Sequence, residues 1–241
     1  MDFIMNLTEK FKFVFIEKER WRYLLDGLGV TLKVTFFAVL LGIAIGVLIA
    51  IIRSTYEKNG KSMRMGFGKM ILSVCNFICK LYLTVIRGTP VVVQLMIMYY
   101  VVLAASRNKV LVAILAFGIN SGAYVAEIFR SGIMSIDEGQ FEAGRSLGFN
   151  FVQTMRYIII PQAFKNVLPA LANEFIVLLK ETSVAGYVAL QDLTKGGDII
   201  RSQTYDAFMS LFGVAAVYLV MVIFFTWLVG RLERRLRSGE R

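Results

Sequence analysis

Glu142-Ala143-Gly144-Arg145-Ser146-Leu147-Gly148, followed by Ile158 and Pro161, is a polar stretch that lies between two strongly apolar segments. An acid in the first turn of a helix interacts favourably with the positive end of the helix dipole. Ala143 and Gly144 leave a low face that another protein's backbone could approach closely. Gly148 predicts a helix end, because glycine adopts left-handed dihedrals at little cost, and Pro161 suits the first turn of the next helix. The stretch therefore predicts a short helix, a corner and a new helix start at the edge of a membrane.

The composition is that of a membrane protein. Of the 241 residues, 57% are hydrophobic and 18% are charged, whereas a soluble domain has about a quarter of its residues charged. No Pro/Gly-rich linker divides the chain, so we expect one membrane domain at 27–231, between an N-terminal segment 1–26 and a basic cytoplasmic tail 232–241. The net charge of +10 comes from bases that flank apolar runs, as the positive-inside rule predicts. This placement argues against a nucleic-acid partner.

Residue types needed for chemistry are scarce. Cys75 and Cys79 are the only cysteines, and the chain has no histidine. A zinc site needs four ligands, usually Cys or His, so we expect two buried thiols and no metal site. A membrane enzyme would need a nucleophile with its base, or a metal cluster, and neither is evident. We therefore expect no catalytic residues and no cofactor in this chain.

Apolar runs predict an all-α fold with about five transmembrane helices. Residues 34–52 carry no charge over nineteen positions, which is about enough to cross a bilayer. We expect the other spans at 91–105, 110–129, 158–179 and 208–230. Residues 1–26 read as an interfacial helix with aromatic side chains at headgroup level, or as a partly ordered tail.

The stretch 70–105 is ambiguous because it is too long for one span. Its polar residues recur every three or four positions, at Ser73, Asn76, Lys80, Thr84 and Arg87. Such a stripe predicts a helix at the cytoplasmic surface or inside the protein, and not one surrounded by lipid. Two spans remain an alternative, so whether 70–87 crosses the membrane or lies along it stays open.

Basic residues set the predicted orientation. Two groups of bases follow the first and last spans, at Arg53, Lys58, Lys61, Arg64 and Lys69, and at Arg231, Arg234, Arg235 and Arg237. Both groups are expected in the cytoplasm. Two spans separate the C-terminal tail from the 142–161 stretch, so that stretch is also expected inside. Five spans place the N-terminus outside.

The polar stretch also resembles the cytoplasmic signature loop of ABC importer permeases, which reads Glu-Ala-Ala, three residues, Gly, nine residues, Ile, one residue, Leu-Pro. The chain matches this pattern at Glu142, Ala143, Gly148, Ile158 and Pro161. It departs at Gly144, where the family prefers Ala, and at Ile160, where the family prefers Leu. Further segments are similar to the polar amino-acid uptake subfamily, which includes histidine, glutamine and arginine permeases: 87–90, 93–95, 120–130, 132–133, 139–140, 173–174 and 180–183.

The resemblance implies the permease subunit of an ATP-driven amino-acid importer in the cell membrane. Two such subunits, identical or similar, would line one pathway, and an extracytoplasmic amino-acid-binding protein would deliver the substrate. Each would dock through its loop on a separate cytoplasmic ABC ATPase chain, and the ATPase dimer would hold the ATP and Mg²⁺. The implied coupling loop comprises Glu142, Ala143, Gly144, Gly148, Ile158 and Pro161. The alternative is an ion- or proton-coupled carrier or channel without an ATPase. Carriers often contain inverted repeats, and none is evident in this sequence.

Polar groups inside the apolar segments are candidates for the substrate pathway, because ionisable groups in a membrane usually face partners or a watery cavity. An amino acid needs donors for its carboxylate and acceptors for its ammonium. The candidates are Arg87, Gln94, Asn120, Glu127, Glu174, Lys180, Thr182 and Ser183. Two alternatives remain: Arg87 and Glu127 could pair only to hold helices together, and Lys180 with Glu181 could be a plain surface pair.

Overall fold

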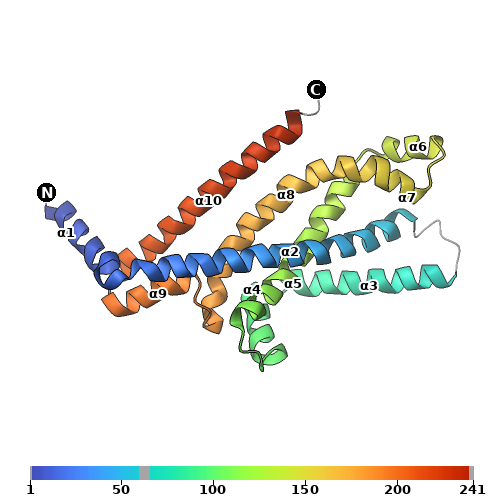
Figure 1. Ribbon diagram of the computed structural model, residues 1–241. Helices are drawn as coiled ribbons and strands as arrows, with labels where there is room; N and C mark the ends of the chain where they lie inside the picture. Colours follow the sequence, from blue (N-terminus) through green and yellow to red (C-terminus); the bar gives the residue numbers. More distant parts are fainter. Residues whose placement is uncertain (1, 60–65, 239–241) are drawn as a thin grey trace. The chain divides into compact units, whose positions relative to one another are not determined.

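The computed structural model describes residues 2–59 and 66–238 (Figure 1). Every regular element in these ranges is a helix, which confirms the all-α prediction and fits a chain whose backbone groups must find partners within the bilayer. The elements are α1 (Asp2–Phe11), η1 (Lys12–Ile16), η2 (Glu17–Glu19), α2 (Trp21–Asn59), α3 (Phe67–Arg87), α4 (Val91–Ile97), η3 (Met98–Val102), α5 (Lys109–Met134), α6 (Glu138–Ser146), α7 (Phe151–Thr154), η4 (Met155–Ile159), α8 (Ile160–Glu181), η5 (Thr182–Val188), α9 (Leu193–Thr204) and α10 (Ala207–Ser238).

The chain divides into two compact units, which are described separately. The first comprises Met1–Ala38, Val91–Phe117 and Ile176–Leu228, and the second comprises Val39–Pro90, Gly118–Phe175 and Val229–Arg241. The long helices α2, α5, α8 and α10 each contribute residues to both units.

Within the described ranges, four helices are long and apolar enough to cross a membrane: Trp21–Lys58, Phe67–Arg87, Lys109–Met134 and Ala207–Arg235. The predicted spans 34–52, 110–129 and 208–230 lie inside three of them. The predicted span 158–179 also forms a helix, α8, but α8 is not among the four. Lys165, Glu174 and Lys180 lie in α8, and such charges lower its mean hydropathy. Of the bases expected in the first cytoplasmic loop, Lys61 and Arg64 lie outside the described residues.

Within 70–105, residues 91–105 do not form a helix long enough for the crossing expected there. The helix over this stretch that can span is α3, whereas residues 91–102 form a seven-residue α-helix followed by a five-residue π-helical segment. Together these two segments are under about 20 Å long, short of the roughly 30 Å hydrocarbon core. Asn76 in the polar stripe is buried, while apolar residues on another face of α3, including Phe77 and Leu81, are exposed. Hydropathy spacing finds such a stripe but does not tell which face is buried.

Close packing of α2 on α5 organises the second unit. A Cβ added at Gly46 would lie 2.5 Å from Val125 Cγ1, and one at Gly42 would lie 3.0 Å from Ser121 Cβ. Only a residue without a side chain allows the two helices to approach this closely. The pair of small residues four positions apart therefore makes the close contact that holds α5 in place.

Candidate functional site

A polar hollow lies in the second unit, within otherwise apolar helices. Its volume is about 530 Å³, and its lining comes from Arg87, Tyr124, Glu127, Ile128, Ser131, Gly132, Ser135, Asn166, Ala170 and Glu174. These residues belong to α5, α8 and the end of α3. Positions 124, 127, 128 and 131 follow helical spacing, so one face of α5 supplies much of the wall. The hollow is large enough for a small polar molecule.

Hydrogen bonds fix several groups in this wall. Ser121 Oγ donates to Glu174 Oε1 over 2.9 Å, and Glu174 is almost fully buried. Asn166 Nδ2 donates to Ser135 Oγ over 3.0 Å, which joins α8 to the residue after α5. The guanidinium of Arg87 lies over the ring of Tyr124, with 5.8 Å from Cζ to the ring centroid. The wall therefore presents a guanidinium, two carboxylates, hydroxyls and an amide in an ordered arrangement.

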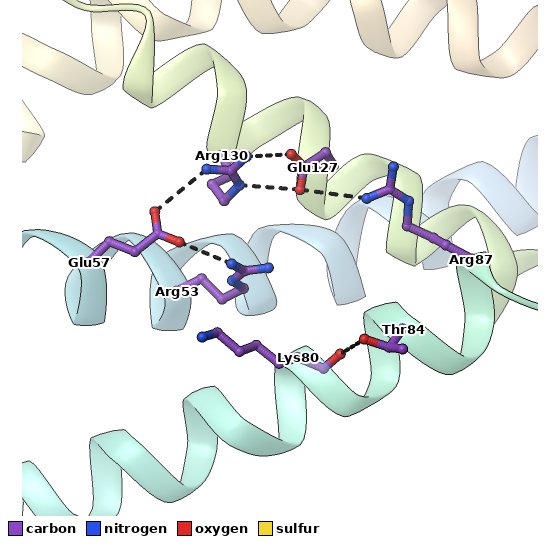
Figure 2. A network of polar contacts seen from close by, with 7 residues as sticks. All are labelled: Arg53, Glu57, Lys80, Thr84, Arg87, Glu127 and Arg130. Atoms are coloured by element: carbon purple, nitrogen blue, oxygen red, sulfur yellow. Dashed lines mark hydrogen bonds and ion pairs between the residues drawn. The ribbon is translucent and has the colours of Figure 1, made fainter.

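Beside the hollow, a chain of ion pairs joins three helices of this unit (Figure 2). Arg130 donates through Nε and Nη2 to the carboxylate of Glu127, with 3.2 Å from Nε to Oε2. Its Nη1 lies 3.6 Å from Glu57 Oε2. Arg53 Nη2 donates to Glu57 Oε1 over 3.0 Å, and Arg87 Nη1 lies 3.9 Å from Glu127 Oε2. Bidentate guanidinium–carboxylate pairs have a defined geometry, so this chain fixes α2, α3 and α5 against one another.

The eight predicted pathway residues are only partly brought together. Arg87, Glu127 and Glu174 line the hollow, and Arg87 also lies within ion-pair distance of Glu127. Asn120 is buried in the same unit but does not line the hollow. Gln94, Lys180, Thr182 and Ser183 belong to the other unit, where the Thr182 hydroxyl donates to the Leu179 carbonyl over 2.8 Å.

Sequence reasoning missed several members of the site. Tyr124 and Asn166 line the hollow, while Arg130, Glu57 and Arg53 form the ion-pair chain. The spacing of acids and bases was readable in part, because Arg53 and Glu57 are four apart and Glu127 and Arg130 are three apart on their helices. Contacts between helices, such as Arg130 with Glu57, have no comparable signal in one sequence.

The quoted polar stretch forms a helical hairpin of α6 and α7, which lie side by side before α8 (Figure 1). The helix α6 begins at Glu138, with Asp137 Oδ1 accepting from Gly139 N over 2.7 Å. It ends in a Schellman motif: Phe149 N donates to Gly144 O over 3.0 Å, Gly148 N donates to Arg145 O over 2.9 Å, and Gly148 has φ +79°. The predicted helix end at Gly148 is confirmed.

Two other details of the stretch differ from the expectation. The acid in the first turn is Glu138, and Glu142 lies one turn later. The next helical segment begins at Phe151, with a capping box between Asn150 and Gln153. Pro161 lies in the first turn of α8, as expected. It follows a π-helical segment, and its missing N–H is compatible with this interruption of the regular hydrogen-bond ladder.

Gly144 does not open a face toward another protein. It is buried, and a Cβ at this position would lie 2.6 Å from Cγ2 of Thr154 in α7. The small residue allows α6 to close onto α7. Ala143 is exposed, and so are three larger apolar side chains of the hairpin, with exposed fractions of 70% for Leu147, 70% for Val152 and 61% for Tyr157.

Contacts with neighbouring helices hold the hairpin in place. Phe141 of α6 packs with Ile133, Ile159 and Ala163, and Ile158 lies against this cluster. Gln162 Nε2 donates to Gln140 Oε1 over 3.1 Å. The ammonium of Lys58, near the end of α2, pairs with Glu138 and lies 4.3 Å from the centre of the Phe141 ring. The hairpin is thus connected to α2, α5 and α8, and its movement would be transmitted to them.

Four helices long and apolar enough to cross a membrane, a polar hollow in the second unit and a polar helical hairpin are typical of a multi-pass membrane transport component. The family model described as "Binding-protein-dependent transport system inner membrane component" matches residues 42–238. The chain belongs to this family, whose members are permease subunits of ABC importers, and it is a multi-pass protein of the cell membrane.

Individual relatives agree with this assignment. The chain is 33% identical over 217 residues to the putative glutamine transport system permease protein GlnP of Rickettsia typhi, covering 89% of this chain and 93% of the relative. It is 32% identical over 222 residues to the arginine transport system permease protein ArtQ of Bacillus subtilis, with 90% and 94% covered. A solved structure described as an amino acid ABC transporter with histidines superposes with a TM-score of 0.79 at 40% identity, over 92% of this chain and 98% of that one.

Proposed function

We propose that this chain forms the translocation pathway of an ATP-driven amino-acid importer and docks on a separate ATPase through the α6–α7 hairpin. The observation that carries the docking role is the hairpin itself, in which both helices have capped starts. It is fixed to three helices, yet Leu147 and Val152 are exposed, as is Tyr157 in the η4 segment that follows it. Exposed apolar residues on a self-stabilised polar segment are typical of a surface that a protein partner covers.

Amino acids fit the polar hollow as a substrate class. A zwitterion carries a carboxylate and an ammonium, and the wall offers Arg87 to the first and Glu127 or Glu174 to the second. Ser131, Ser135 and Asn166 add hydroxyl and amide groups. Relatives named for glutamine and arginine transport support the same class.

In this proposal ATP and Mg²⁺ bind to the ATPase dimer, a second permease copy or a similar chain completes the pathway, and an extracytoplasmic binding protein delivers the substrate. Closure of the ATPase dimer would draw two hairpins together and switch the pathway between inward- and outward-facing states. Such a switch requires that ATP bind the two states with different affinity. The Gly148 corner and the ties to α2, α5 and α8 would transmit the movement.

The docking role is tested by co-purification with the proposed ABC ATPase partner. Leu147→Asp and Val152→Asp place a charge on the exposed apolar residues, and each should weaken ATPase association by about tenfold or more. Tyr205→Asp is the matched control, because Tyr205 is 93% exposed in another polar segment and has a left-handed backbone that Asp tolerates. Wild-type ATPase recovery with both hairpin variants would contradict the proposal.

Uptake by reconstituted complexes tests the transport role. Proteoliposomes with the binding protein should accumulate one or a few labelled amino acids from a panel only when ATP is supplied. Concentrative uptake by the purified chain without any nucleotide-hydrolysing partner would instead support the carrier or channel alternative.

A further inference from the structure

A second hollow in the same unit is lined by three cationic side chains. Its volume is about 510 Å³, and Arg53, Lys80 and Arg87 surround it together with Leu83, Thr84 and Gly88. Arg53 and Lys80 project from α2 and α3 into the space between these helices (Figure 2). No carboxylate contributes to this lining, so the hollow concentrates positive charge.

The nearby acids do not neutralise this charge. Glu57 pairs with both Arg53 and Arg130, and Glu127 pairs with both Arg130 and Arg87. Two carboxylates therefore pair with three guanidinium groups. Among the described residues, the Lys80 ammonium has no carboxylate within ion-pair distance and no hydrogen-bond acceptor.

One donor at the edge of the hollow also lacks a partner. Nε of Arg53 is buried without a hydrogen bond to any described residue, and a buried donor left unpaired costs free energy. Nη2 of the same guanidinium binds Glu57. An anion between Arg53 and Lys80 would neutralise the excess charge of the cations that line the hollow.

We propose that this hollow binds a phosphate-bearing anion, either a phospholipid headgroup or a free phosphate. Guanidinium and ammonium groups are the side chains that bind phosphate oxygens most strongly. The exposed face of α3 next to the hollow carries Ile78, Leu81 and Val85, which could contact acyl chains beside a bound headgroup. The site differs in ligand from the pathway hollow, although Arg87 lines both, and it does not depend on the substrate or the ATPase proposed above.

Binding to the purified full-length chain tests the site directly. Native mass spectrometry would measure the dissociation constants of dioleoylphosphatidylglycerol, dioleoylphosphatidylcholine and inorganic phosphate. Removing one cation near a membrane surface costs about 1 kcal/mol of binding free energy, so Lys80→Gln should lower the affinity for the anion about fivefold. Lys80→Arg should restore binding, and Arg53→Gln should weaken it in the same direction.

Lys69→Gln is the matched control, because it removes the same charge from the same helix but lies outside the hollow. Tighter binding of phosphatidylglycerol than of phosphatidylcholine, lost with Lys80→Gln and kept with Lys69→Gln, would identify a lipid headgroup. The same dependence on Lys80 for inorganic phosphate, without a preference for the anionic lipid, would identify free phosphate. Equal effects of Lys80→Gln and Lys69→Gln on every probe would overturn the proposal.

Discussion

The α6–α7 hairpin and α9 are short polar segments with similar ends and different faces. An aspartate caps the start of α6 and of α9, at Asp137 and Asp192. A residue with a left-handed backbone follows each helix, Gly148 after α6 and Tyr205 after α9. Caps of this kind satisfy the terminal backbone groups of a helix locally. The capped ends of each segment therefore need no hydrogen-bond partner from the apolar helices around it.

The two segments use their glycines differently. In α9, a Cβ at Gly196 would lie 2.3 Å from the carbonyl oxygen of Tyr23 in α2, and a Cβ at Gly197 would lie 2.1 Å from Val214 Cγ2 in α10. In α6, the buried Gly144 faces Thr154 of its own hairpin. The contacts of α9 join separate helices of its unit, whereas the contact of Gly144 closes the hairpin on itself.

This difference separates a structural segment from an exposed one. The buried side of α9 includes Leu193, Ile200 and both glycines, so α9 helps to hold its unit together. The hairpin keeps its small residue for internal packing and leaves Leu147 and Val152 exposed. Substitutions at the two kinds of glycine should therefore lower the stability by different amounts and disturb different parts of the structure.

The largest effect is expected from Gly196→Ala. The new methyl group would meet a backbone carbonyl, which cannot rotate away as a side chain can, so we expect a loss of about 3 kcal/mol of stability. Gly29→Ala is the control in the same unit, because no atom lies within 4 Å of a Cβ there, and alanine favours the helix by about 1 kcal/mol. Thermal unfolding of the detergent-purified chain measures both. Equal melting temperatures for the two variants would show that α9 is not seated against α2 as described.

A smaller and local effect is expected from Gly144→Ala. The methyl group would crowd Cγ2 and Oγ1 of Thr154 at 2.6 and 2.7 Å, which costs about 1–3 kcal/mol, against a gain of about 1 kcal/mol in helix propensity. In a Thr154→Ala background the two shortest contacts disappear and the Cβ of residue 154 remains at 3.1 Å, so the same substitution should cost much less. Thr154 Oγ1 is buried without a partner among the described residues, so its removal breaks no hydrogen bond.

Hydrogen exchange of the α6 amides measures this coupling, because it reports local opening separately from global unfolding. Among the four proteins of the double-mutant cycle, only the single variant Gly144→Ala should show faster exchange. Additive effects of the two substitutions would contradict the close approach of Gly144 to Thr154.

Much of this architecture was readable in the sequence, and the limits have physical causes. The uncharged run 34–52 and the glycine at 148 are local signals, and the structure confirms a helix and a helix end there. The starts of α6 and α7 also carry local signals that our sequence analysis missed, since Asp137 precedes Glu138 and Asn150 lies three residues before Gln153. Local signals of this kind depend only on neighbours in the chain.

Features that depend on contacts between helices were not readable. Within the stripe Asn76 is buried whereas Lys80 and Arg87 are exposed, and this depends on how helices pack, which spacing alone does not specify. The same holds for Gly144, which faces Thr154. Three of the eight predicted pathway residues line one hollow. A list of polar residues in apolar helices does not show which of them share a cavity, because that depends on the rotation of each helix.

The smallest expected effects compare the two aspartate caps. Asp192 is only 1% exposed and accepts from the backbone N–H groups of Thr194 and Lys195 over 3.1 and 3.0 Å, whereas Asp137 is exposed. Replacing a capping aspartate by alanine costs about 1 kcal/mol. We expect about this loss for Asp192→Ala and a smaller one for Asp137→Ala, since water can replace an exposed cap.

Asp192→Asn sharpens the comparison, because asparagine keeps the cap and removes the charge. Burial raises the pKa of the Asp192 carboxyl above its ordinary value, against the lowering effect of its backbone hydrogen bonds. The folded chain therefore binds this proton more tightly than the unfolded chain does, and the contribution to stability is lost as pH rises through the raised pKa. Asp198 has its pKa lowered by hydrogen bonds from Lys195 and Arg201, but it is present in both proteins and cancels in the difference. The wild type should thus gain stability relative to Asp192→Asn as pH falls from about 7 toward about 4, measured as the difference in melting temperature. A difference that does not change with pH would show that the Asp192 carboxyl is not held in a desolvated site.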